Sequence, residues 1–176
     1  MKRLFPVIAR LALAFVLFLS FQAQALAAVE IAFHSRELGG SFPHAFIHLT
    51  GTVDSTGEPV DIAYGFTART VSPAILFGPV PGEVFVEGDE RIRHSDRQFH
   101  FTLTDEQYRT VMAVVEEWRN RPQPSYSLSR ANCIHFVAAV ASALGLQVEL
   151  VPRLMRRPRS FLIYQRELNP GRVTPN

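Results

Sequence analysis

The chain has 176 residues, of which 47% are hydrophobic and only 19% are charged. This composition excludes an intrinsically disordered protein, and the length leaves room for one ordinary domain. The single cysteine excludes an intrachain disulfide and a thiolate-rich metal site.

The N-terminal residues have the three parts of a secretory signal peptide. Basic residues open the chain, residues 11–21 form an apolar run, and Ala25-Leu26-Ala27 is a small-x-small cleavage site. The run is short for a membrane span, which needs about 20 apolar residues. We therefore expect residues 1–27 to be removed, the mature chain to have no transmembrane span, and the protein to be periplasmic or secreted. The alternative is a signal that stays attached as an anchor.

The charge of the mature chain is nearly balanced but unevenly distributed. The signal takes three of the 18 basic residues with it and none of the 16 acids, which leaves a net charge of −1 and argues against a nucleic-acid-binding protein. Residues 151–176 carry six arginines and one acid. We therefore divide the mature chain into a domain over 28–150 and an Arg-rich C-terminal extension over 151–176. The extension is either a solvated tail or a segment that docks on an anionic surface, such as a membrane or a cell-wall polymer.

Strand patterns come first in the mature chain, and helical patterns follow. The strand candidates are residues 29–34, 44–50, 60–66, 83–87, 98–103 and 147–151, with a loop over 72–82 and a surface turn over 89–96. Helices are predicted from the capping box at 104–107 to Pro122, over 132–144 and over 160–168. This order predicts an α+β fold in which a mainly antiparallel sheet packs against two principal helices.

Cys133 is the candidate nucleophile. It lies at the start of the helix predicted over 132–144, directly after the polar stretch 125–130. The first turn of a helix presents unpaired N–H groups and the positive end of the helix dipole, and both favour a thiolate over a thiol. The alternative is a cysteine that only fills space in the core. Its place at the helix start, and the oxidation risk of an unpaired thiol in an exported protein, argue for a chemical role.

A cysteine nucleophile needs a histidine within hydrogen-bond reach, and His44 is the candidate general base. It opens a predicted strand just after a loop that contains glycine and proline. His48 shares its strand face, because alternate residues of a strand point the same way. A competing interpretation joins His44, His48 and His100 in a three-histidine zinc site, although no spacing in the sequence demands it.

Four short motifs, in this order along the chain, resemble permuted members of the NlpC-like papain-fold superfamily. They are SFPHAF at 41–46, YGF at 64–66, LTDEQY at 103–108 and NCIHFV at 132–137. The resemblance implies a papain-like fold in which the helix carrying Cys133 packs on an antiparallel sheet that carries His44. It also implies hydrolysis or transfer at an acyl or amide bond, with no metal and no organic cofactor.

The resemblance further implies a third polar residue that orients His44, usually from the next strand. That strand offers Asp61 and Tyr64, and His48 is a further candidate. The expected function is that of an exported cysteine peptidase or amidase that cleaves amide bonds in peptidoglycan or other peptides. One alternative is an acyltransferase or thioesterase acting on lipids, which the apolar loop at 73–81 would suit. The other is a non-catalytic binding or regulatory module, which the lack of a clear third residue favours.

Overall fold

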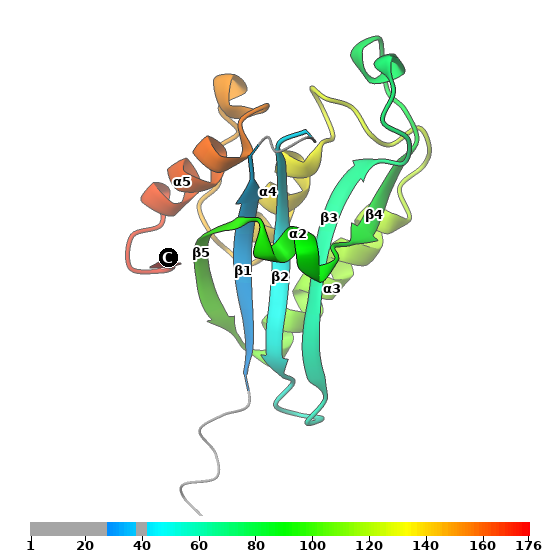
Figure 1. The fold of residues 1–176 in the computed structure, drawn as a ribbon. Coiled ribbons are helices and arrows are strands. Elements are labelled where there is room, and N and C mark those ends of the chain that lie inside the picture. Colours follow the sequence, from blue (N-terminus) through cyan, green and yellow to red (C-terminus); the bar gives the residue numbers. More distant parts are fainter. Residues whose placement is uncertain (1–27, 38–41) are drawn as a thin grey trace, which may run out of the picture.

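The structure, a computed structural model, describes residues 28–37 and 42–176. The expected signal peptide over 1–27 and the glycine pair Gly39-Gly40 lie outside the described residues. The described chain folds as a six-stranded antiparallel sheet with helices on both faces (Figure 1). The predicted α+β class with an antiparallel sheet is therefore confirmed.

The sheet has the strand order β4-β3-β2-β1-β5-β6, so β1 and β2 lie at its centre. All five neighbouring pairs are antiparallel, and β1 pairs with both β2 and β5 over almost its full length. The strands are β1 (Val29–Arg36), β2 (His44–Thr52), β3 (Pro59–Ala68), β4 (Gly82–Val86), β5 (Asp96–Leu103) and β6 (Thr174–Pro175).

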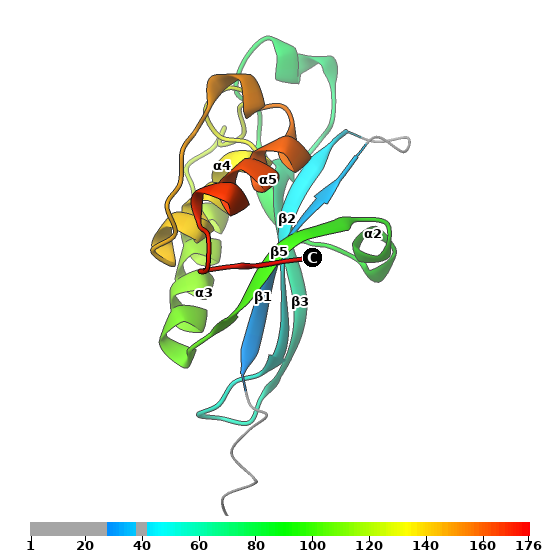
Figure 2. The same cartoon turned by 90° about the vertical axis from the view of Figure 1, so that its left-hand side faces the viewer.

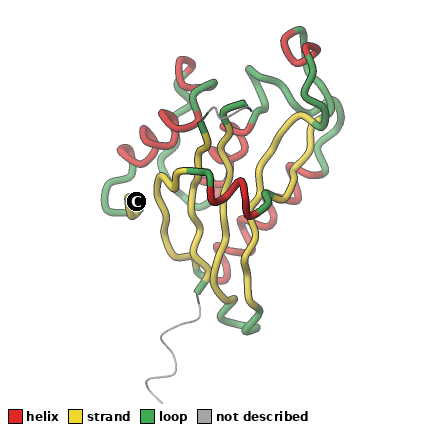
Figure 3. Tube along the Cα trace, in the orientation of Figure 1, coloured by secondary structure: helices red, strands yellow, loops and turns green. Residues whose placement is uncertain are grey.

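Three helices cover one face of the sheet, and a short fourth helix lies against the other face (Figure 2). The covering helices are α3 (Asp105–Arg119), α4 (Cys133–Ala143) and α5 (Pro158–Leu168), and the short one is α2 (Asp89–Arg93). Two 3₁₀ turns, η2 (Pro73–Leu76) and η3 (Pro152–Leu154), lie in the connecting loops, which Figure 3 separates from the helices and strands by colour. The core between the sheet and the three helices is built from fully buried side chains such as Phe33, Ile47, Phe66, Phe136 and Phe161.

The structure departs from the prediction at two elements. Residues 89–93, expected as a surface turn, form α2. Residues 147–151, expected as a strand, have no strand partner among the described residues, because side-chain amides take the place of a neighbouring strand. Asn169 accepts from the Gln147 N–H at 2.8 Å and donates to its carbonyl at 2.8 Å, and Gln165 pairs with Glu149 in the same way at 3.1 and 2.9 Å.

The C-terminal residues are part of the layered fold. Helix α5 packs against β1 and β5, with Phe161 and Leu162 buried, and β6 adds to the sheet beside β5. Within the described residues, each helix falls short of the length and apolarity needed to cross a bilayer.

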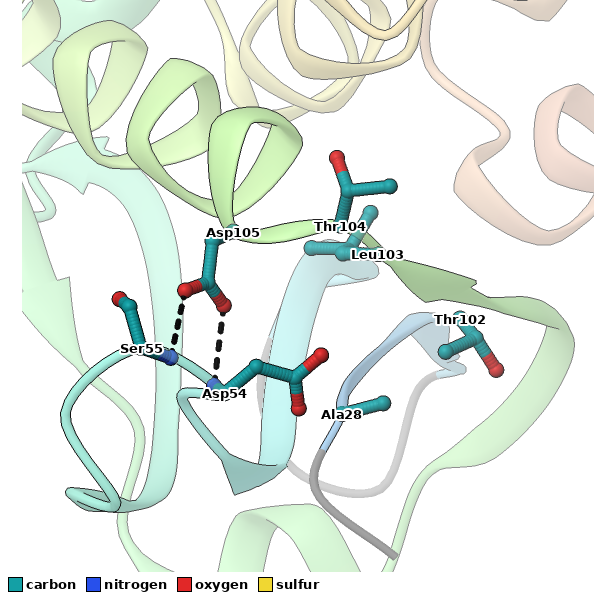
Figure 4. A pocket seen from close by; sticks show the side chains of 7 residues that line it. All are labelled: Ala28, Asp54, Ser55, Thr102, Leu103, Thr104 and Asp105. Carbon is teal, nitrogen blue, oxygen red and sulfur yellow. Dashed lines mark hydrogen bonds between the residues drawn. The ribbon is translucent and has the colours of Figure 1, made fainter. Parts of the chain in front are cut away.

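The sheet end at which β2 stops is closed by a polar contact. The carboxylate of Asp105, in the first turn of α3, accepts hydrogen bonds from the backbone N–H groups of Asp54 and Ser55 at 3.0 and 2.8 Å (Figure 4). A shallow hollow lies beside this contact, and its seven lining residues include no cysteine and no histidine. The chemistry-bearing side chains gather instead at the opposite end, where β2 begins with His44.

Candidate active site

Cys133 is the first residue of α4, and the residue before it caps the helix. The side chain of Asn132 accepts hydrogen bonds from the N–H groups of Ile134 and His135 at 2.9 and 3.2 Å. The amide group of the same side chain donates to the carbonyls of Leu128 and Met155, both at 2.9 Å. Asn132 is itself buried, so it ties the start of α4 to two loops and holds Cys133 in place.

His44 reaches Cys133 from the first position of β2. Helix α4 packs across β2 and β3, so its first turn lies beside the start of β2, and the side chains of His44 and Cys133 hydrogen bond. The Nε2 atom of His44 lies 3.1 Å from Glu87 Oε1. The structure thus brings together the two residues that the sequence nominates as nucleophile and base.

The two side chains shift each other's pKa toward a charged pair. Burial by itself lowers the pKa of His44, but the Cys133 thiolate and the contacts with Cys133 and Glu87 raise this pKa to about 9. Burial by itself raises the pKa of Cys133, but the charge and hydrogen bond of His44, with the N–H groups of Ala45 and Ile134, lower it. Both shifts favour the thiolate and imidazolium form of the pair over the neutral form.

Glu87 is the group behind the imidazole, and it lies just beyond the end of β4. Its side chain is 1% exposed, and its backbone N–H donates to the carbonyl of Ala63 at 2.9 Å. One carboxylate oxygen faces His44 at 3.1 Å, with the geometry of an ion pair rather than of a straight hydrogen bond. The other oxygen accepts from Arg91 of α2 at 3.4 Å. A row of alternately basic and acidic side chains thus runs from the surface to the buried sulfur. Its members, in order, are Arg91, Glu87, His44 and Cys133.

Gly65 makes room for this row. It is a β3 residue paired with Phe46, on the sheet face that carries His44 and Glu87. A Cβ atom at position 65 would lie 2.5 Å from His44 Nε2 and 2.8 Å from Glu87 Oε1. Because real Cβ atoms essentially never come this close to other heavy atoms, only glycine at position 65 leaves the His44–Glu87 contact undisturbed.

The pair opens into a cleft of about 830 Å³. Cys133 and His44 are 7% and 9% exposed, so each presents a small part of its surface to this space. Most lining side chains are apolar, among them Val71, Leu76 and Met155. The charged lining residues are four arginines and one acid: Arg36, Arg69, Arg91, Arg156 and Glu83.

The three residues proposed from the sequence to orient His44 lie elsewhere. Tyr64 belongs to the core on the opposite face of the sheet, where the guanidinium of Arg119 lies over its ring. His48 and Asp61 pair with each other at 2.8 Å, and the ring of Phe46 separates them from His44 along the strand face. Glu87, and none of these three residues, is the polar side chain beside the His44 imidazole. Tyr64 faces the other side of the sheet, while His48 and Asp61 share the face of His44 but contact each other instead.

The three-histidine zinc site does not form. His48 is held by Asp61, and His100 faces Glu30 at 3.5 Å on β1. The described residues contain no group of three or more histidine, cysteine or acidic side chains arranged to hold a metal ion.

Three residues of the site, Glu87, Gly65 and Asn132, were missed in the analysis of the sequence. Asn132 carried a usable signal, since asparagine directly before an apolar helix is a preferred N-cap. Gly65 sits inside a strand pattern, where an isolated glycine points to a close approach. Glu87 carried no distinguishing signal, because it is the last residue of the strand predicted over 83–87 and the pattern of that strand does not show which side chains it meets.

Comparison with protein-family models, with curated proteins and with solved structures finds no match to this chain.

Proposed function

We propose that this protein is an exported cysteine hydrolase of the permuted NlpC-like papain fold that cleaves amide bonds in peptides, with peptidoglycan peptides as the expected substrate. One observation carries the proposal: Cys133 and His44 form a hydrogen-bonded, nearly buried pair that borders an open cleft and has Glu87 behind the imidazole. Such a pair keeps a thiolate ready near neutral pH and a proton ready for the leaving group.

The first half of the reaction makes a thioester. The Cys133 thiolate attacks the carbonyl carbon of the scissile amide, and the carbonyl electron pair moves onto the oxygen. The backbone N–H of Cys133, in the first turn of α4, is positioned to donate to that oxyanion. The C–N bond then breaks while the His44 imidazolium gives its proton to the leaving amine.

The second half restores the pair. Neutral His44 takes a proton from a water molecule as the water oxygen attacks the thioester carbon. Breakage of the C–S bond releases the carboxylic acid product and returns the thiolate beside the imidazolium. Throughout the cycle, Glu87 favours the charged form of His44 and orients its ring.

Glu87 also bears on the binding-module alternative. The binding-module alternative was favoured because the sequence shows no clear third residue. A buried carboxylate 3.1 Å from His44 Nε2 is a candidate for that residue, so this reason no longer favours a binding module. The lipid alternative keeps a specific observation in its favour, because the lining of the cleft is mostly apolar and includes four arginines. An acyl chain with an anionic headgroup would suit such a lining.

The test follows product release by mass spectrometry from purified peptidoglycan peptides and, in parallel, from an acyl thioester and a phospholipid. We expect cleavage of the peptides, its loss in Cys133→Ala and His44→Ala, and a reduction of about tenfold or more in Glu87→Gln. His48→Ala and Glu90→Gln are the matched controls and keep full activity, since neither residue reaches the site.

Three results would contradict the proposal in different ways. Cleavage that survives Cys133→Ala excludes a cysteine mechanism. Turnover of the lipid substrates alone favours the acyltransferase or thioesterase. A Cys133 thiol that reacts with alkylating agents only after denaturation favours a binding module.

A further inference from the structure

Exposed apolar side chains gather at the mouth of the cleft. Six large apolar side chains are exposed in the described part of the chain. Three of them, Phe42, Val71 and Leu76, line the cleft, and a fourth, Phe77, directly follows Leu76. Leu76 and Phe77, at the end of η2, are 73% and 88% exposed. Soluble proteins rarely leave such side chains together in water, so this cluster marks an interaction surface.

Unpaired positive charge lies at the same end of the molecule. Arg156 lines the cleft, as Leu76 does, and Arg157 follows it at the start of α5. Both side chains are exposed, and no acid among the described residues pairs with either of them. Glu83, the one acid among the described residues that line the cleft, is paired with Arg69 at 3.6 Å. Figures 1 and 2 show η2 and η3 at the same end of the molecule, away from the Asp105 contact, with η2 on the side of β3 and β4 and η3 on the side of α5.

We propose that this cleft-mouth surface, defined by Leu76, Phe77, Arg156 and Arg157, docks onto an anionic lipid bilayer. Leucine and phenylalanine on a protruding turn insert into the boundary between headgroups and acyl chains, while arginines bind the lipid phosphates. A soluble anionic polymer would use the arginines and leave the apolar tips in water. An apolar protein partner would use the tips and leave the arginines without anions. A lipid surface satisfies both.

Docking of this kind turns the opening of the cleft toward the membrane, so that a substrate held at the bilayer is presented to Cys133. The proposal goes beyond the hydrolase function and does not depend on it, because binding to a bilayer requires no turnover. The Cys133→Ala variant is therefore expected to bind vesicles as the parent chain does, and this separates failure of docking from failure of catalysis.

The experiment is vesicle flotation with residues 28–176, which contain every described element; residues 1–27 are left out because their apolar run would itself bind lipid. The probes are vesicles of phosphatidylcholine alone and of phosphatidylcholine mixed with anionic phosphatidylglycerol. We expect binding to the mixed vesicles that weakens with added salt, and at most weak binding to the neutral ones.

Two double variants test the two halves of the surface. Leu76→Ser with Phe77→Ser, and Arg156→Gln with Arg157→Gln, each weaken binding to the mixed vesicles by about tenfold or more. The matched controls are Val86→Ser, an exposed aliphatic residue outside the cleft, and Arg109→Gln with Arg166→Gln, which remove the same charge elsewhere. Circular dichroism melts show whether each variant is folded.

The proposal is overturned if folded parent protein stays with the aqueous phase, or if the controls weaken binding as much as the test variants. It is also overturned if the arginine variant alone weakens binding and soluble polyphosphate competes fully, because the surface would then recognise an anionic polymer rather than a bilayer.

Discussion

At the scale of single residues, the chemistry of this site depends on opposite charges held close together with little access to water. Neither Cys133 nor His44 would be charged at its depth alone, since burial disfavours the ionised form of each. The ionised form of each favours the ionised form of the other, and the Glu87 carboxylate lies 3.1 Å from His44 on the far side of the imidazole.

This mutual dependence predicts the pH profile of Cys133. In the parent chain, we expect rapid alkylation by iodoacetamide down to mildly acidic pH, with the rate lost only as pH falls through the lowered pKa of the thiol. In His44→Ala, burial dominates and raises the thiol pKa, so the rate at about pH 6 falls by about tenfold or more and recovers in alkali. If His44→Ala has the same alkylation rate and pH profile as the parent chain, the ion pair is contradicted. His48→Ala is the control and should behave as the parent does.

The same pair sets the alkaline limit of turnover. His44 must carry a proton to release the amine, and its pKa is raised to about 9, so kcat/KM should fall as pH rises through that value. Glu87→Gln removes a group that raises this pKa, and the alkaline limb should therefore move to lower pH. An alkaline limb that stays in place in Glu87→Gln shows that Glu87 does not act through His44.

Gly65 offers a test of space rather than of charge. In Gly65→Ala, the added methyl group must displace His44 or Glu87, because it would lie 2.5 Å from one and 2.8 Å from the other. We expect loss of most of the activity and of the rapid alkylation of Cys133, with a stability cost of about 1–3 kcal/mol. Gly78→Ala is the control, since a Cβ there meets no atom within 4 Å. Full activity in Gly65→Ala would mean that the contact between His44 and Glu87 is dispensable.

At the scale of elements, the position of the sulfur is set by how α4 begins. Asn132 caps α4 and also donates to the carbonyls of Leu128 and Met155, so one buried side chain joins the helix to the loops on both sides of it. The cap of α3, by contrast, is the exposed residue Thr104, which makes only local contacts.

This difference predicts unequal costs for removing the two caps. Asn132→Ala should lower the free energy of unfolding by about 2–4 kcal/mol, because the helix loses its cap and two backbone carbonyls lose their hydrogen-bond donors. Thr104→Ala should cost about 1 kcal/mol. Urea denaturation measures both, and Asn132→Asp, which keeps the acceptor and loses the donors, separates the two contributions. Equal costs for the two caps would show that the contacts with the loops contribute little.

At the scale of the whole molecule, the two faces of the sheet differ in the polarity of their side chains. The face under α3, α4 and α5 carries the apolar core, while the opposite face carries polar side chains, among them Glu87 and several histidines. His34 lies on this second face, buried beside His48, with its Nδ1 atom 2.9 Å from the hydroxyl of Ser95. Burial first, and then the charges of His48 and Arg97, lower its pKa from 6.5 to about 4.

The lowered pKa of His34 therefore predicts that the protein loses stability in acid. Between its folded pKa of about 4 and its unfolded value of 6.5, the unfolded chain binds a proton that the folded chain excludes. The stability that neutral His34 contributes is complete above the unfolded pKa and is lost as pH falls toward the folded one, by about 2 kcal/mol at about pH 5. Urea denaturation at about pH 7.5 and about pH 5 should show a smaller acid loss in His34→Gln than in the parent chain. Equal losses would mean that His34 is protonated in the folded protein.

The α+β class with an antiparallel sheet follows from the sequence by itself, because alternation, capping and helical spacing are local patterns. The same holds for the place of Cys133 at a helix start and of His44 at a strand start. Only the tertiary structure decided that Glu87, rather than Tyr64, His48 or Asp61, stands behind the imidazole. Glu87 is joined to His44 through the pairing of β2 with β3 and of β3 with β4, and a local pattern carries no information about contacts across strands.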